Sequence, residues 1–198
     1  MTFGQRLARV VTNTALRWPR LWPLVRPVMR KQFDRIAPTW DSLRSDESLA
    51  PFRAALDAVD PAPDEVLDVG TGTGAGAEEL VRRFPEARVV GVDLAPAMLE
   101  LARAKVPSAR FERADASALP FGDASFDLVT HANMLPFFDE VARVLRPGGR
   151  ALFAFSAGPQ TPIYASPERL RAELERRGFV DFAEFAAGNG TALLARKR

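Results

Sequence analysis

A short apolar segment that runs directly into a cluster of glycines constrains the fold of this chain most strongly. Residues 66–69 read Val-Leu-Asp-Val, and residues 70–76 read Gly-Thr-Gly-Thr-Gly-Ala-Gly. Such a run is typical of a strand that is buried on both faces of a parallel sheet. The glycines allow a sharp turn and a close approach of a ligand to the main chain. Because a following helix presents unpaired N–H groups, the segment predicts a strand, an anion-binding loop and a helix.

Strands and helices alternate along the rest of the chain. Apolar runs predict seven strands, at residues 66–69, 88–93, 109–113, 126–130, 151–156, 179–186 and 191–196. Helices are predicted at residues 77–84, 96–105, 136–145 and 167–177. The predicted fold is α/β, with a doubly wound, mostly parallel seven-stranded sheet, a C-terminal antiparallel hairpin and an N-terminal helical arm. We expect an arm or lid in residues 1–60 and a ligand-binding domain in residues 61–198.

The composition excludes several kinds of site. The 198 residues include no cysteine, which excludes disulfides, thiolate–zinc sites, iron–sulfur clusters and thiol nucleophiles. The single histidine, His131, also excludes a metal site with several imidazole ligands, so we expect no metal centre. No run of 18 apolar residues and no signal-peptide pattern is present, which favours a cytoplasmic protein.

Basic charge is concentrated in the N-terminal arm. Residues 1–36 contain eight basic residues and one acid, whereas the remainder contains 19 basic and 24 acidic residues. This asymmetry suggests an anionic partner for the arm. Three interpretations stay open: the arm packs over the domain as a lid, it makes peripheral contact with a membrane or lipid, or it binds nucleic acid. The acidic remainder of the chain disfavours nucleic acid.

Prolines interrupt the helical pattern of the arm. Apolar residues recur at helical spacing over residues 3–14 and predict one amphipathic helix. Pro19, Pro23 and Pro27 then follow at intervals of four residues. Each proline lacks an N–H and clashes with the preceding helical turn, so we expect no regular helix across residues 18–28.

An acidic residue ends the second predicted strand. Asp93 lies about twenty residues beyond the glycines, where a carboxylate accepts hydrogen bonds from both ribose hydroxyls of a bound nucleoside. Gly70, Gly72 and Ala75 also fit the looser dinucleotide fingerprint. These two features therefore leave an NAD-dependent oxidoreductase open beside other nucleoside-binding enzymes.

Five motifs in order resemble the class I S-adenosylmethionine-dependent methyltransferases, particularly the small-molecule branch that includes quinone-biosynthesis enzymes. The motifs occupy residues 66–74, 92–99, 114–121, 126–129 and 144–149. The resemblance covers roughly residue 64 to the end, and more loosely residues 33–41. It implies a Rossmann-like fold and S-adenosylmethionine as cofactor.

The resemblance also implies roles for individual residues. Asp68 and the glycine loop would hold the methionine end, Asp93 the ribose, and Asp115 with the Ala116 N–H the adenine amine. Leu94 and Met98 would contact the adenine or belong to the core. The expected cofactor-binding residues are Asp68, Gly70, Thr71, Gly72, Thr73, Gly74, Asp93, Leu94, Met98, Asp115, Ala116 and His131.

The acceptor is expected at residues 131–138, after the fourth predicted strand, because ligands bind at the carboxyl ends of parallel strands. His131 is a candidate general base, since the pKa of imidazole lies near neutrality, or it has a structural role. The candidate acceptor-binding residues are Phe33, Trp40, Asn133, Met134 and Phe137. In Phe33 and Trp40 the arm keeps the aromatic character of the family's tyrosine pair but lacks its hydroxyls.

We expect transfer of a methyl group to oxygen or carbon of a small, hydrophobic acceptor. Residues 133–136 read Asn-Met-Leu-Pro and differ from the Asn/Asp-Pro-Pro-aromatic motif of enzymes that methylate amides and nucleobase amines. A non-catalytic protein that binds S-adenosylmethionine or S-adenosylhomocysteine stays open as an alternative. A homodimer, in which a second subunit covers the pocket, also stays open.

Overall fold

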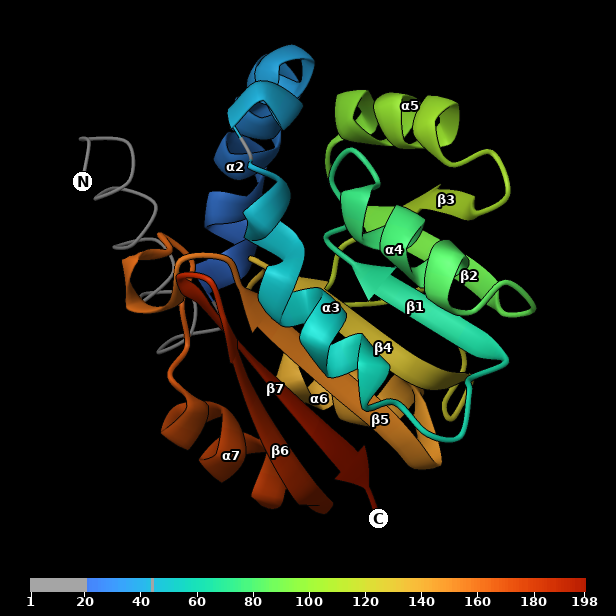
Figure 1. The fold of residues 1–198 in the computed structure, drawn as a ribbon. Coiled ribbons are helices and arrows are strands. Elements are labelled where there is room, and N and C mark those ends of the chain that lie inside the picture. The colour runs from blue at the N-terminus through green and yellow to red at the C-terminus, as the bar shows by residue number, and fades with distance from the viewer. Residues whose placement is uncertain (1–20, 44) are drawn as a thin grey trace.

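The computed structural model describes residues 21–43 and 45–198, so the helix expected over residues 3–14 lies outside the described residues. Within them one sheet of seven strands has the order β3-β2-β1-β4-β5-β7-β6 (Figure 1). Neighbouring strands from β3 to β5 are parallel, and β7 runs antiparallel to both β5 and β6. The strands are β1 (Glu65–Val69), β2 (Arg88–Asp93), β3 (Arg110–Arg113), β4 (Phe126–Ala132), β5 (Leu145–Phe155), β6 (Phe179–Ala187) and β7 (Gly190–Lys197). The α/β fold expected from the sequence is confirmed.

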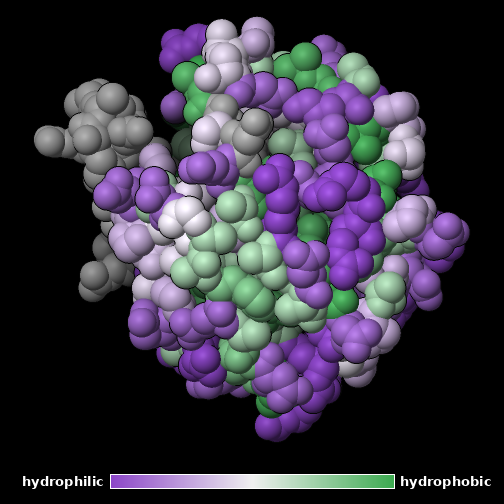
Figure 2. Space-filling view, viewed as in Figure 1, coloured by the Kyte–Doolittle hydropathy of each residue, from purple (hydrophilic) through white to green (hydrophobic). Residues whose placement is uncertain are grey.

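Helices cover both faces of this sheet. The three helices α3 (Ala50–Asp57), α4 (Ala75–Arg83) and α5 (Pro96–Lys105) share one apolar core with the sheet, and α6 (Phe138–Val144) and α7 (Pro167–Glu175) share the other. Successive residues of β1 belong to different cores, Val66 to the first and Leu67 to the second, because side chains alternate along a strand. Figure 2 shows hydrophilic side chains over much of the face that carries α3 and α4.

Short 3₁₀ turns complete the described fold. They are η2 (Ala37–Thr39), η3 (Asp41–Leu43), η4 (Asp46–Leu49) and η5 (Gly158–Gln160). At α7 the Ser166 hydroxyl accepts a hydrogen bond from the Arg169 N–H at 3.4 Å, and Pro167 occupies the first turn, as the sequence predicts. No helix within residues 21–43 and 45–198 is long and apolar enough to cross a bilayer.

The arm contains a regular helix where the sequence predicts none. Helix α2 runs from Trp22 to Ile36 and therefore contains Pro27, so the expectation for residues 22–28 is wrong. Pro23 lies in the first turn, where a backbone N–H has no intrahelical acceptor. Pro27 costs one internal hydrogen bond, and burial of Trp22 and Met29 against the domain offsets that cost.

The fourth strand is longer than predicted, which moves the sole histidine. The sequence predicts a strand that ends at residue 130, but β4 continues to Ala132, which pairs with Ala154 of β5. His131 therefore lies within the sheet, between Val69 of β1 and Phe153 of β5, and not in the loop after the strand. The prediction was too short because a His-Ala pair carries no strong strand signal.

Candidate functional site

A pocket lies at the carboxyl ends of β1, β2 and β4, beneath the inner face of α2. Its empty volume, which includes open solvent at the mouth, is about 1010 Å³. Twelve of the residues proposed from the sequence line it: Phe33, Trp40, Asp68, Gly70, Thr71, Gly72, Asp93, Leu94, Met98, Ala116, Asn133 and Met134. The doubly wound topology predicts a ligand at this edge of the sheet.

The glycine loop is shaped by two close approaches. Gly70 has φ +70°, and a Cβ there would lie 2.7 Å from Cγ of Met134, so a larger residue would collide. Gly72 also has a positive φ, +54°, and its N–H donates to Oδ2 of Asp93 at 3.0 Å. These contacts tie the loop after β1 to the end of β2 and leave room beside the main chain.

The Asp93 carboxylate accepts hydrogen bonds from backbone N–H groups and can accept more. Its Oδ1 accepts from the Ala95 N–H at 2.9 Å, and its Oδ2 accepts from the Gly72 N–H. A carboxylate has about four lone-pair positions, so acceptor capacity remains for hydroxyl donors in the pocket. Burial raises the pKa of Asp93 above its ordinary value, although these backbone hydrogen bonds favour the charged form.

Two further polar groups face the same loop from the sheet. Asp68 is 2% exposed, and its Oδ1 accepts from the Thr130 hydroxyl at 2.8 Å. A Cβ at Gly76 would lie 3.0 Å from its Oδ2, so glycine at the start of α4 makes room for this carboxylate. The Thr71 hydroxyl is buried without a hydrogen-bond partner among the described residues. A ligand that offers a donor or acceptor there would remove the cost of this unpaired group.

Aromatic residues of the arm cover the pocket. Phe33 and Trp40 meet edge to face with their ring centroids 5.8 Å apart, and both line the pocket. Trp22 is 5% exposed, lines the pocket and contacts Phe137 edge to face at 5.3 Å. The Thr73 hydroxyl donates to Asp41 at 2.5 Å, which joins the glycine loop to the arm.

Asp115 is tied to the arm across 89 and 93 residues of sequence. Its Oδ2 accepts from Arg26 at 2.6 Å, and its Oδ1 accepts from the Trp22 indole N–H at 2.8 Å and from the N–H of Ser117 at 2.9 Å. Burial opposes ionisation, but these hydrogen bonds prevail and hold the pKa of Asp115 below its ordinary value. The carboxylate lines an adjoining hollow together with Arg26, Arg30 and Arg113.

Five residues proposed from the sequence do not line the main pocket: Thr73, Gly74, Asp115, His131 and Phe137. Gly74 has φ +87° and N-caps α4, which explains the glycine by backbone geometry. His131 is 2% exposed and stacks on Phe153 at 4.8 Å. Burial lowers the pKa of His131 to about 3, and its Nδ1 has no hydrogen-bond partner among the described residues. The imidazole is therefore neutral and directed into the core.

The sequence reasoning did not assign several pocket residues. Met29 of α2 and Ile163 after η5 line the pocket, together with Trp22 and with Leu135 of the expected acceptor segment 131–138. Trp22, Met29 and Phe33 share one face of α2, a spacing that signals a buried helix face once the helix is accepted. Ile163 carries no such signal, because an isolated apolar loop residue has many possible neighbours.

S-adenosylmethionine, the cofactor that the resemblance implies, fits these groups. The free acceptor capacity of Asp93 suits two ribose hydroxyls, and the apolar Leu94, Met98 and Ala116 suit an adenine ring. Asp68 and the unpartnered Thr71 hydroxyl suit the ammonium and carboxylate of the methionine end.

Comparison with known proteins agrees with this geometry. The family described as "Methyltransferase domain" matches residues 66–149. A demethylmenaquinone methyltransferase of Deinococcus radiodurans is 42% identical over 158 residues, which cover 72% of this chain and 66% of that protein. A malonyl-[acyl-carrier protein] O-methyltransferase of Laribacter hongkongensis is 37% identical over 153 residues, or 67% of this chain and 51% of that protein.

The chain thus spans less than two thirds of the length of these curated relatives. Among solved structures, the [4+2]-cyclase SpnF has a TM-score of 0.66 at 17% identity, with 85% of this chain and 94% of that chain covered. That likeness concerns the fold alone, whereas the family model matches residues 66–149, which include pocket residues from Asp68 to Leu135. From the sheet order, the pocket and these sequence matches we conclude that the chain belongs to the class I S-adenosylmethionine-dependent methyltransferase family.

Proposed function

We propose that this protein transfers the methyl group of S-adenosylmethionine to oxygen or carbon of a small, hydrophobic acceptor. The observation that carries the proposal is the pocket in which Asp68, the glycine loop and Asp93 meet a wall of apolar side chains. When bound, the cofactor supplies an electrophilic methyl group on a sulfonium, so the chain itself needs no further electrophile.

The residues of the chain bind, orient and exclude water. When the cofactor is bound, Asp93 would accept hydrogen bonds from the ribose hydroxyls at its middle, and Asp68 with the glycine loop would hold its methionine end. The rings of Trp22, Phe33 and Trp40 close the pocket from the arm side. Alignment of acceptor and methyl group in a water-poor site accounts for much of the rate in a displacement of this kind.

The lining of the pocket limits the acceptor. Among the described residues, its titratable side chains are Asp68 and Asp93, and both are assigned to the cofactor. Such a pocket suits an acceptor that loses its proton without help from a protein base that titrates near neutral pH. A hydroxylated aromatic ring is an example. One of the two relatives is named a demethylmenaquinone methyltransferase, and an acceptor of that kind, a ring with an apolar chain, agrees with the apolar lining of the pocket.

Transfer of radiolabel from S-adenosyl-[methyl-³H]methionine tests the proposal directly. We expect label in the organic extract when a reduced demethylated naphthoquinone with a short isoprenoid chain is the acceptor. An aliphatic hydroxy acid of similar size, which lacks the ring, is the matched negative acceptor. Transfer to neither compound, in a preparation that binds S-adenosylhomocysteine, would favour the non-catalytic alternative.

That alternative rests on one observation. The fold is shared with SpnF, whose name describes a cyclase, so the fold by itself does not establish methyl transfer. An NAD-dependent oxidoreductase is the weaker alternative, because the pocket that accepts the ribose is closed by the bulky Trp22 and Phe33. Thermal stabilisation by S-adenosylhomocysteine but not by NAD separates a protein that binds S-adenosylmethionine from an NAD-dependent oxidoreductase.

We further propose that the outer face of α2 contacts an anionic lipid surface. Leu24 and Val28 are 75% and 64% exposed, and Lys31 and Arg35 follow them on the same side of the helix. Exposed apolar side chains beside cations favour the boundary of a membrane with negative headgroups.

We expect sedimentation with vesicles that contain roughly 30% phosphatidylglycerol, an anionic lipid, and not with neutral vesicles. The variant Leu24→Ser/Val28→Ser should lose about tenfold in vesicle affinity, because two apolar contacts are removed. Equal binding of the variant and the unaltered protein would refute this role of α2.

A further inference from the structure

The loop that carries the adenine-side residues is fixed at both ends by hydrogen bonds. At its start, the Ala114 N–H donates to the carbonyl of Asp93 at 3.1 Å, next to the ribose site. The carbonyl of Asp115 then accepts from the Ala118 N–H at 2.9 Å, which closes a tight turn. The position of Ala116, which lines the pocket, therefore also depends on what holds the chain immediately after the turn, at Leu119.

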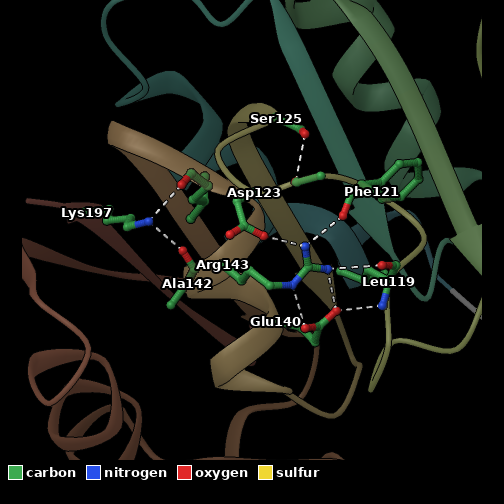
Figure 3. A network of polar contacts seen from close by, with 10 residues as sticks. Leu119, Phe121, Asp123, Ser125, Glu140, Ala142, Arg143 and Lys197 are labelled. Atoms are coloured by element: carbon green, nitrogen blue, oxygen red, sulfur yellow. Dashed lines mark hydrogen bonds and ion pairs between the residues drawn. The ribbon is translucent and has the colours of Figure 1, made fainter.

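One arginine of α6 holds this part of the loop. The Arg143 Nη2 donates to the Leu119 carbonyl at 3.0 Å, and its Nη1 donates to the Phe121 carbonyl at 2.7 Å (Figure 3). The same guanidinium donates to Asp123 at 2.9 Å and, from Nε and Nη2, to both oxygens of Glu140 at 2.8 Å. All five N–H donors of Arg143 are used, which fixes the side chain in one orientation.

Glu140 completes the arrangement by binding the N–H of the same residue, Leu119. Its Oε2 accepts from the Leu119 N–H at 2.6 Å, so the N–H and the carbonyl of one residue are both bound by the Glu140–Arg143 pair. The Arg143 guanidinium beside it holds the pKa of Glu140 below its ordinary value, and the carboxylate stays charged at neutral pH. Figure 3 shows the two side chains pointing from α6 toward this loop.

We propose that Arg143 and Glu140 are positioning residues for adenine recognition: by binding the carbonyl and the N–H of Leu119 they fix the turn that presents Ala116 to the adenine. The inference rests on the proposed cofactor site and names residues that touch no cofactor themselves. Lysine cannot replace Arg143, because a single ammonium has three donors on one atom and does not span two carbonyls and a carboxylate.

The test compares Arg143→Gln with Arg177→Gln. Arg177 is a matched control, since it donates to Asp139 at 2.7 Å and to Glu173 at 2.8 Å, has a similarly exposed side chain and touches no residue of the loop. We expect about a tenfold loss of S-adenosylhomocysteine affinity by calorimetry in Arg143→Gln and less than a twofold loss in Arg177→Gln, on the scale of one or two hydrogen bonds. Similar thermal midpoints for both variants would show that folding does not explain the difference.

A second readout separates positioning from general weakening. S-inosyl-L-homocysteine carries an oxygen in place of the adenine amine and a proton on N1, so its N1 offers no acceptor to the backbone N–H of Ala116, which the resemblance places beside the adenine. We expect the unaltered protein to prefer the adenine compound about tenfold or more, and Arg143→Gln and Glu140→Gln to reduce that preference to about threefold.

The outcomes are distinct. If Arg143→Gln keeps both the affinity and the preference of the unaltered protein, the positioning role is wrong. If it loses affinity for both compounds equally, Arg143 supports the domain without orienting the adenine site, which also overturns the inference. If the unaltered protein binds neither compound, the proposed cofactor site fails and the fault does not lie with Arg143.

Discussion

Asp93→Ala is expected to lower the affinity for S-adenosylhomocysteine by about 100-fold, because two charge-assisted hydrogen bonds to the ribose are lost. The variant also releases the N–H groups of Gly72 and Ala95 that the carboxylate holds. Isothermal titration calorimetry measures the loss directly. An affinity within threefold of that of the unaltered protein would contradict the ribose assignment.

Asp127→Ala is the matched control for the released N–H groups. Asp127 lies in β4 and accepts from the Asp64 N–H at 3.1 Å and from the Glu65 N–H at 2.9 Å, but it does not line the pocket. Its loss removes two comparable backbone hydrogen bonds and should leave the affinity unchanged.

The 2′-deoxy analogue of S-adenosylhomocysteine separates the ribose contact from the shape of the loop. We expect the unaltered protein to bind this analogue about tenfold more weakly than the parent compound, because one hydroxyl contact is missing. Asp93→Ala should bind the two compounds alike. A persisting preference in the variant would mean that another group recognises the hydroxyl.

The parts of the fold that were predictable carry local signals. The glycines after β1, the acidic end of β2 and the Ser166–Pro167 start of α7 each have a backbone reason that the sequence displays. Spacing places Asp68, Gly72 and Asp93 at one edge of the sheet, because parallel strands end together. The family resemblance adds the identity of the cofactor.

The parts that were not predictable depend on contacts between distant segments. Local rules exclude a helix at Pro27, but the burial of Trp22 and Met29, which forms only in the folded chain, outweighs the lost hydrogen bond. The partners of Asp115 on α2 lie about ninety residues away, and nothing at either position identifies the other. The same holds for Arg143 and the Leu119 peptide, which are 24 residues apart.

His131 shows how one strand boundary changes a chemical interpretation. At the first position of a loop an imidazole is a good candidate for a general base, since its pKa lies near neutrality. Because β4 continues beyond residue 130, His131 pairs with Phe153 of β5, and its side chain stacks on Phe153 inside the sheet. The consequence of that burial is measurable as a dependence of stability on pH.

The unaltered protein is expected to lose about 2 kcal/mol of unfolding free energy between pH 7.5 and pH 5 through His131. In the unfolded chain the imidazole binds a proton below about pH 6.5, whereas in the folded protein burial lowers the pKa to about 3. Over this window the unfolded state binds more protons, so stability falls as the pH falls. Because His131 is the only histidine in the sequence, no other imidazole contributes.

His131→Leu removes the titrating group and fills the space beside Phe153 with an apolar side chain. We expect its urea-unfolding free energy to change less than that of the unaltered protein over the same pH range, by about the 2 kcal/mol assigned to His131. Parallel loss of stability in both proteins would show that the imidazole is hydrated or protonated in the folded state. Methyl transfer by the same variant tests the catalytic hypothesis. A general base would cost about 10²–10⁴-fold in rate, whereas a buried, neutral imidazole outside the pocket predicts a loss below about tenfold.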